Sequence, residues 1–144
     1  MPNAIYPKWK EQIEQGTASA LLNGSGVTGV YVALVDTAIY TYNAADEFYD
    51  AGGAGDVVDG VVGTPMEIGA TKTYTDGTFD GADVTFTSVT GASVEALVIF
   101  IKNAGAQTTW RLVSYIDTSV TGLPVTPNGG NITITWSASG IFTL

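Results

Sequence analysis

Residues 95–102 read Glu-Ala-Leu-Val-Ile-Phe-Ile-Lys, and this octapeptide decides the fold class. Its apolar centre is bounded by one charged residue at each end, a pattern that predicts a strand buried on both faces of a sheet. Residues 132–136 show the other strand pattern, because Ile132, Ile134 and Trp136 alternate with threonines. The chain therefore builds both a fully covered strand and a half-covered strand.

Further strand signals surround these two segments, separated by turns rich in glycine, asparagine and aspartate. The chain has 144 residues, among them 15 Val, 10 Ile, 20 Thr and 18 Gly. About eight short strands at this spacing predict a single mainly β domain, a β-sandwich or barrel. We expect an N-terminal arm and helix over residues 1–26 and the β domain over residues 27–144. The other strands are expected at residues 27–36, 39–42, 66–68, 72–75, 84–87, 110–116 and 141–144.

One short helix is expected near the N-terminus. Tyr6, Trp9 and Ile13 recur at three- and four-residue spacing, which is typical of one helix face. Pro7 suits the first turn of a helix and Gly16 suits its end. The pattern predicts a surface helix that lies on a sheet or on a neighbouring molecule.

Two local predictions concern the middle of the chain. Asn43 is a suitable N-cap for a short helix over residues 44–49. Glycines at positions 52, 53, 55 and 60 predict that the following stretch is an irregular loop with little structure of its own.

The composition excludes several classes of site and partner. The chain has no Cys and no His, which excludes disulfides, thiol nucleophiles, Cys/His metal sites and histidine-based triads. Its formal net charge is −9, so we expect no nucleic-acid partner and no membrane partner. Residues 36–83 hold ten acidic residues and one base, Lys72, which predicts one acidic face on an otherwise nearly neutral molecule. Neither a secretion signal nor a membrane span is apparent.

Carboxylates offer candidate metal and acid–base chemistry. Asp76, Asp80 and Asp83 lie in one turn-rich segment and could bind Ca²⁺, but Asp76 and Asp80 each precede a glycine and are better interpreted as turn residues. Glu95 and Asp117 flank apolar strands, where either could have a raised pKa, yet nothing marks them as a catalytic pair. We expect no catalytic residue, no metal and no cofactor.

Tryptophan side chains can stack on sugars, so the three tryptophans are candidates for a sugar-binding surface. Trp136 alternates with core isoleucines and Trp9 shares the apolar face of the helix. Trp110 follows the polar run Gln107-Thr108-Thr109 and is the tryptophan free to be exposed.

Four segments of the chain resemble a family of small virion structural proteins of tailed bacteriophages. They are residues 4–10 (Ala-Ile-Tyr-Pro-Lys-Trp-Lys), 32–49, 77–86 and 122–133 (Gly-Leu-Pro-Val-Thr-Pro-Asn-Gly-Gly-Asn-Ile-Thr). The resemblance contains no catalytic motif. It implies a particle component that is present in many copies.

A capsid decoration, or cement, protein is the expectation that combines this resemblance with the composition. Such a protein would bind the major capsid protein on the outer capsid surface as a homotrimer, after synthesis in the host cytoplasm. The alternatives are a tail or neck protein (tube, connector or adaptor), with residues 51–63 as an insertion loop, and a glycan-binding module of the virion. The expected partner contacts are Tyr6, Trp9, Ile13 and Trp110.

That expectation carries a consequence for truncation. If Tyr6, Trp9 and Ile13 contact the capsid, deletion of residues 1–15 leaves a folded protein that no longer binds. If Trp9 instead packs into the protein's own core, the same deletion costs stability.

Overall fold

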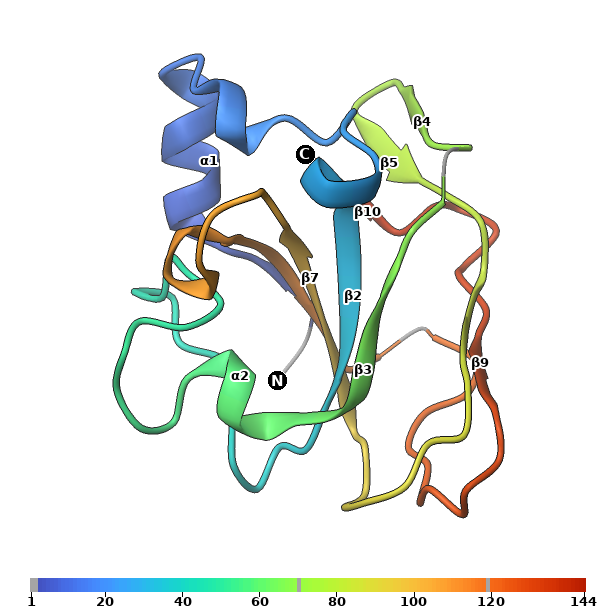
Figure 1. The fold of residues 1–144 in the computed structure, drawn as a ribbon. Helices are drawn as coiled ribbons and strands as arrows, with labels where there is room; N and C mark the ends of the chain where they lie inside the picture. The colour runs from blue at the N-terminus through green and yellow to red at the C-terminus, as the bar shows by residue number, and fades with distance from the viewer. Residues whose placement is uncertain (1–2, 70, 119) are drawn as a thin grey trace.

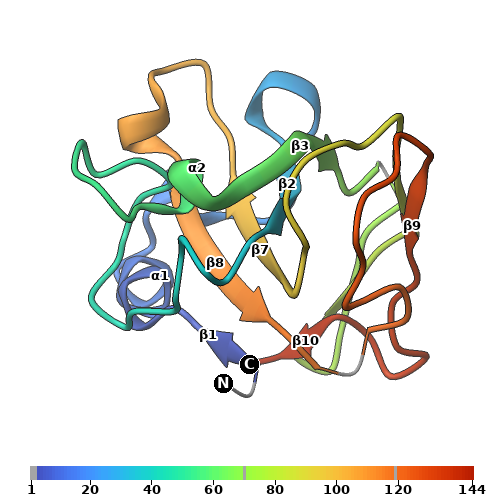
Figure 2. The ribbon, with the colours of Figure 1, turned by 90° about the horizontal axis from the view of Figure 1, so that it is seen from below.

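One large antiparallel sheet and two smaller ones form the framework of the molecule (Figure 1). This computed structural model describes residues 3–69, 71–118 and 120–144, and within them ten strands are present. Figures 1 and 2 show the small sheets on one side of the large sheet and helix α2 (Val57–Gly60) on the other. The expected mainly β, sandwich-like single domain with a short N-terminal helix is confirmed.

The apolar octapeptide forms the centre of the large sheet. Its core is β7 (Ala96–Ile101), in which all six residues are buried. β7 pairs with β2 (Val30–Val35) on one side and with β8 (Arg111–Ile116) on the other. Two edge strands complete the sheet, β1 (Ala4–Ile5) beside β8 and β3 (Val61–Glu67) beside β2. The predicted strand buried on both faces is therefore confirmed.

The two small sheets come from the second half of the chain. Their members are β4 (Thr73–Thr75), β5 (Thr78–Asp80), β6 (Val84–Phe86), β9 (Ile132–Ile134) and β10 (Phe142–Thr143). β5 pairs with both β4 and β10, whereas β6 pairs with β9. The sequence patterns did not predict β5, because the Asp-Gly pairs at 76–77 and 80–81 both indicate turns. Asp80 is the last residue of β5 and pairs with Thr73, so its interpretation as a turn residue is wrong.

Asp76 and Gly77 form the two-residue turn between β4 and β5. Their φ angles are +52° and +76°, the left-handed values that a tight hairpin of this kind requires. Asp-Gly is a favoured pair for such a turn, so the interpretation of Asp76 as a turn residue is confirmed.

The N-terminal arm and helix belong to the same core as the strands. Helix α1 (Pro7–Glu14) begins with Pro7 in its first turn, and the chain leaves it through Gly16, whose φ is +70°. Tyr6 and Trp9 join the buried cluster of the β strands. Residues 1 and 2 of the expected arm lie outside the described residues.

The predicted helix over residues 44–49 is wrong. Asn43 instead begins a tight turn, since its Oδ1 accepts the Ala45 N–H and its carbonyl accepts the Asp46 N–H. Phe48 then forms an isolated antiparallel bridge with Arg111. The expected strand at 39–42 is also wrong, because residues 37–39 form a turn in which the Asp36 carbonyl accepts the Ile39 and Tyr40 N–H groups, and no strand follows up to residue 42.

The glycine-rich loop is more structured than its composition predicts. Asp56 Oδ2 accepts the N–H groups of Ala51 and Gly53, each at 3.0 Å. Asp59 Oδ2 accepts the N–H groups of Gly55 and Asp56, and α2 follows directly. Two carboxylates thus supply the hydrogen bonds that a glycine-rich backbone lacks when it forms neither helix nor strand.

Candidate functional site

Tyr6 is a core residue. Its ring is fully buried, and its hydroxyl lies 2.7 Å from the Tyr40 hydroxyl. Tyr40 in turn donates to Asp46 Oδ2 at 2.9 Å, so three side chains form one hydrogen-bonded chain from the N-terminal arm to the 43–50 segment. Burial, followed by the charge of neighbouring Asp56, raises the pKa of the Asp46 carboxyl, although the Tyr40 hydrogen bond opposes this shift.

Trp9 is also a core residue. Its side chain is 1% exposed, and its indole N–H donates to the Ala20 carbonyl at 2.9 Å. Its ring meets Phe142 of β10 edge to face, with centroids 5.7 Å apart. The expectation of a free surface at Tyr6 and Trp9 is therefore corrected, because the 18–20 turn and β10 cover this face of the helix. Deletion of residues 1–15 would remove core side chains.

Ile13, one turn further along α1, remains partly exposed and lines an apolar groove. The groove encloses about 370 Å³ and lies between α1, the 18–24 segment and β4. Three of its side chains are strongly exposed: Leu21 at 52%, Tyr74 at 50% and Leu144 at 61%. The groove is lined by Trp9, Ile13, Ala20, Leu21, Leu22, Asn23, Tyr74 and Leu144. We call this feature the apolar groove.

A second hollow of about 340 Å³ lies on the other side of the 18–24 segment. Its lining combines a lysine, two asparagines and hydroxyl groups with a few apolar side chains. The lining residues are Ala18, Ser19, Leu21, Asn23, Gly24, Thr28, Ile101, Lys102 and Asn103. We call this feature the Lys102 pocket.

Aromatic rings hold the ammonium group of Lys102 at the edge of this pocket. Its Nζ lies 5.0 Å from the ring centroid of Tyr31 and 5.2 Å from that of Trp110. Trp110 stacks on Phe100 at an interplanar angle of 10°, and its indole N–H donates to the Gly105 carbonyl. Trp110 is therefore partly exposed, as expected, but it belongs to a fixed aromatic cluster.

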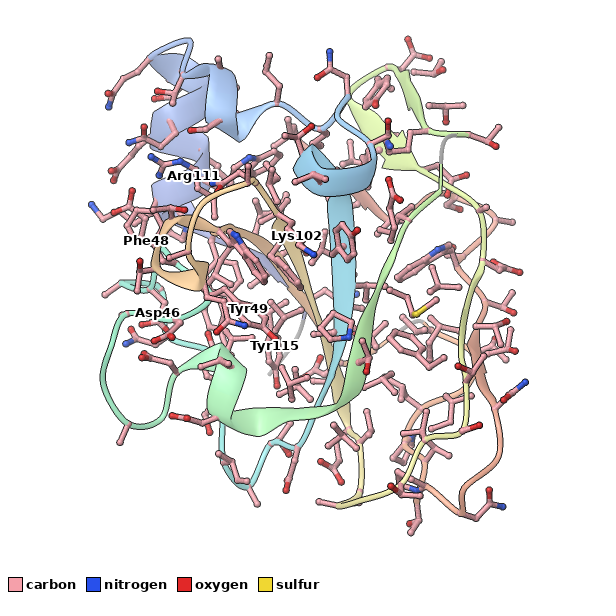
Figure 3. All side chains as sticks on the ribbon, viewed as in Figure 1. Asp46, Phe48, Tyr49, Lys102, Arg111 and Tyr115 are labelled. Carbon is pink, nitrogen blue, oxygen red and sulfur yellow. The ribbon has the colours of Figure 1, made fainter. Side chains whose placement is uncertain are left out.

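Arg111 lies near the Lys102 pocket and has its own partners. Its guanidinium pairs with the Glu47 carboxylate, packs over the Phe48 ring and donates from Nε to Ser19 Oγ at 3.2 Å. Figure 3 shows Arg111 and Phe48 close together on the side of the molecule that carries α1 and α2. The neighbouring Tyr49 is buried, which together with the charge of Asp50 raises its pKa to about 12.

The sequence did not single out Lys102 and Tyr31. Tyr31 is the partner of Phe100 in the β2–β7 register, and Lys102 follows two residues after Phe100. A prediction that β2 pairs with β7 would have placed Tyr31 beside Phe100 and close to Lys102.

The candidate carboxylates have structural partners. Asp83 Oδ1 accepts the Trp136 N–H at 3.0 Å. Glu95 accepts the Thr37 N–H and hydroxyl, and hydrogen bonds, first from Ser93 and then from Thr37, lower its pKa. The idea of a raised pKa at Glu95 is therefore wrong. Within the described residues, no group of three or more acidic side chains is arranged to hold a metal ion.

The site and the fold together define a class, a sandwich-like antiparallel β protein with an apolar groove beside a polar, lysine-edged pocket. Comparison of the chain with protein-family models, with curated proteins and with solved structures finds no match. In the part of the chain that the structure describes, no helix has the length and apolar character needed to cross a bilayer.

Proposed function

We propose that this chain is a non-enzymatic structural protein of a tailed-bacteriophage particle, a decoration protein that binds the major capsid protein on the outer surface of the shell. In this proposal it adds as a homotrimer, assembles in the host cytoplasm and needs no cofactor, nucleic acid or membrane. The resemblance of four segments of the sequence to small virion proteins supports a place in a phage particle. The exposed apolar groove supports binding to the protein shell.

The apolar groove is the observation that carries the proposal. Leu21, Tyr74 and Leu144 are each at least half exposed and lie around one hollow, whereas exposed apolar residues of a lone soluble protein are normally scattered. Contiguous exposed apolar surface of this kind marks protein–protein contacts. Burial of such surface across shell subunits would stabilise the particle without any catalytic group.

The uneven distribution of charge on the molecule supports binding through the apolar groove. The rim of the groove continues to Lys10 and Glu14, which carry opposite charges, while the segment 36–83 carries the formal charge of −9. None of the described residues that line the groove has a charged side chain, and all but Tyr74 lie outside this acidic segment, so the groove can approach another protein without a large electrostatic penalty. The acidic part would remain in water and keep particles apart.

The tail or neck alternative requires residues 51–63 to act as a long insertion loop. The structure folds residues 51–56 back onto the carboxylates of Asp56 and Asp59, so this segment is compact. No feature of the loop favours a tail protein over a decoration protein.

A pair of matched variants tests the proposal. Leu21 and Ile39 are both 52% exposed, but only Leu21 lines the apolar groove. The wild type should bind preformed shells saturably at fixed stoichiometry in a sedimentation assay. Leu21→Asp should weaken this binding at least tenfold, and Ile39→Asp should bind like the wild type.

Two results would contradict the proposal. Wild-type protein that does not sediment with shells would exclude a decoration role. Equal loss of binding in both variants would show that the groove is not the contact surface.

A further inference from the structure

We propose that the Lys102 pocket binds a sugar that carries one carboxylate, such as a uronic acid. This activity differs from the shell contact, because it depends on Lys102 and Ser19, which do not line the apolar groove, although the two hollows share Leu21 and Asn23. The argument rests on the charge, the neutral polar groups and the rigidity of the pocket.

Lys102 brings a positive charge that no carboxylate neutralises in the part of the chain the structure describes. Arg111, the other cation nearby, pairs with Glu47. Glu67 is the last residue of β3, which pairs with β2 and not with β7, and its Oε1 accepts the Gly26 N–H at 2.7 Å. The contacts of Lys102 with the Tyr31 and Trp110 rings hold the ammonium group and leave its N–H donors available for an anion.

The neutral groups of the pocket suit sugar hydroxyls. Ser19 Oγ accepts a hydrogen bond from Arg111, so its own hydroxyl hydrogen remains to be donated. The carboxamide of Asn23 is exposed and makes no hydrogen bond to another described residue, so both its oxygen and its NH₂ group can bind ligand. Ile101 and Leu21 supply apolar surface for the C–H groups of a sugar ring.

The pocket fits this class of ligand better than a phosphate. One lysine matches the single charge of a carboxylate, whereas phosphate groups carry up to two charges and are commonly held by a bidentate arginine. The volume of about 340 Å³ lies at the small end of the range for ligand sites, about 300–1,000 Å³. A monosaccharide is therefore the expected size.

The surroundings of Lys102 are already ordered. Its backbone N–H donates to the Gly29 carbonyl at 3.0 Å, and the indole N–H of Trp110 is bonded to Gly105. Because the ammonium group is restrained before a ligand arrives, binding loses less side-chain entropy than it would at a mobile lysine.

Titration of ¹⁵N-labelled full-length protein with glucuronate, followed by NMR, tests the proposal. Glucose is the matched neutral sugar, since it differs by the absence of the carboxylate. Glucuronate should shift the signals of the Asn23 side-chain amide and the Trp110 indole N–H saturably, and at least about tenfold more tightly than glucose. Lys102→Met keeps a long apolar side chain between the rings and should weaken glucuronate binding at least about tenfold. Lys10→Met, which removes an exposed charge on α1, should bind glucuronate like the wild type.

Several outcomes would overturn the proposal. They are the absence of a saturable shift at Asn23, equal affinity for glucose and glucuronate, and unchanged affinity in Lys102→Met. Inorganic phosphate or acetate that binds as tightly as glucuronate would reduce the pocket to a general anion site and would also overturn the assignment to a sugar. Shell binding of Lys102→Met is measured in parallel, because it should be unchanged whichever way the titration ends.

Discussion

The apolar groove and the Lys102 pocket share the 18–24 segment and differ in nearly everything else. Leu21 and Asn23 line both hollows. On one side the segment faces Ile13 and Tyr74, and on the other it faces Lys102 and the end of β7. The chemistry of each hollow is therefore set by the elements that lie opposite the loop.

The two hollows suit different partners for the same reason. Apolar side chains that are half exposed lose water most favourably when a broad protein surface covers them. An ammonium group with free donors beside neutral polar groups gains more from a small, complementary polar ligand. The comparison predicts that substitutions at residues lining only one hollow leave the function of the other intact.

The largest expected effect is at the base of the apolar groove. Trp9→Ala should lower the free energy of unfolding by about 3–5 kcal/mol, because it removes a fully buried ring and orphans the Ala20 carbonyl. Trp110→Ala, on the side of the Lys102 pocket, should cost less, since Trp110 is partly exposed. Urea unfolding measures both values. A larger loss for Trp110→Ala would contradict the assignment of Trp9 to the core.

The next effect is in the buried hydrogen-bonded chain. Tyr40→Phe removes the hydroxyl between Tyr6 and Asp46 and should cost about 1–3 kcal/mol, because the Tyr6 hydroxyl would be left buried without a partner. Tyr74→Phe, at the exposed rim of the apolar groove, removes a hydroxyl bonded to the Leu22 carbonyl and serves as the control. Thermal unfolding compares them. Equal losses of stability in the two variants would show that the buried hydrogen bonds of Tyr40 contribute no more than a surface hydrogen bond.

Two carboxylates should give opposite dependences of stability on pH. The pKa of Asp46 is raised in the folded state. Its contribution to the free energy of unfolding is therefore complete below the ordinary aspartate pKa and is lost as the pH rises through the folded-state pKa. The pKa of Glu95 is lowered in the folded state. Its contribution to the free energy of unfolding is therefore present above the ordinary glutamate pKa and is lost as the pH falls through the folded-state pKa.

Unfolding free energies at several pH values test this contrast. As the pH falls, the wild type should gain stability relative to Asp46→Asn and lose stability relative to Glu95→Gln. Parallel curves for both variants would contradict the two environments described for these carboxylates.

The smallest expected effects concern surface cations. Lys8 and Glu11 form an exposed ion pair at 3.0 Å, so Lys8→Ala should cost no more than about 0.5 kcal/mol. Lys102→Met should cost somewhat more, about 0.5–1 kcal/mol, because it removes two cation–π contacts. Chemical unfolding with replicate curves resolves the order. Lys8→Ala as the more destabilising change would argue against a restrained ammonium at the pocket.

Local sequence patterns predicted the strands with strong periodicity and missed the features that depend on distant partners. Residues 95–102 contain β7, and residues 132–136 contain β9. Both strands could be predicted because the order of apolar and polar residues shows directly whether one face or both faces are buried. The loop at 51–60 was missed as an ordered element, since its hydrogen bonds come from two aspartate side chains rather than from a repeating pattern.

The same limit explains the candidate site. The helical spacing of Tyr6, Trp9 and Ile13 was correct, but the sequence could not show that β10 and the 18–20 turn cover Trp9 and leave Ile13 partly open. Lys102 was passed over because its importance depends on Tyr31, a residue 71 positions away that strand pairing brings beside it.

Localisation on the particle tests the central proposal most directly. Labelled protein, or an antibody against it, can be viewed by electron microscopy on intact virions beside separated heads and tails. Label distributed over the whole head is the result that a decoration protein predicts. Label confined to the tail or neck, or absent from the particle, would contradict it.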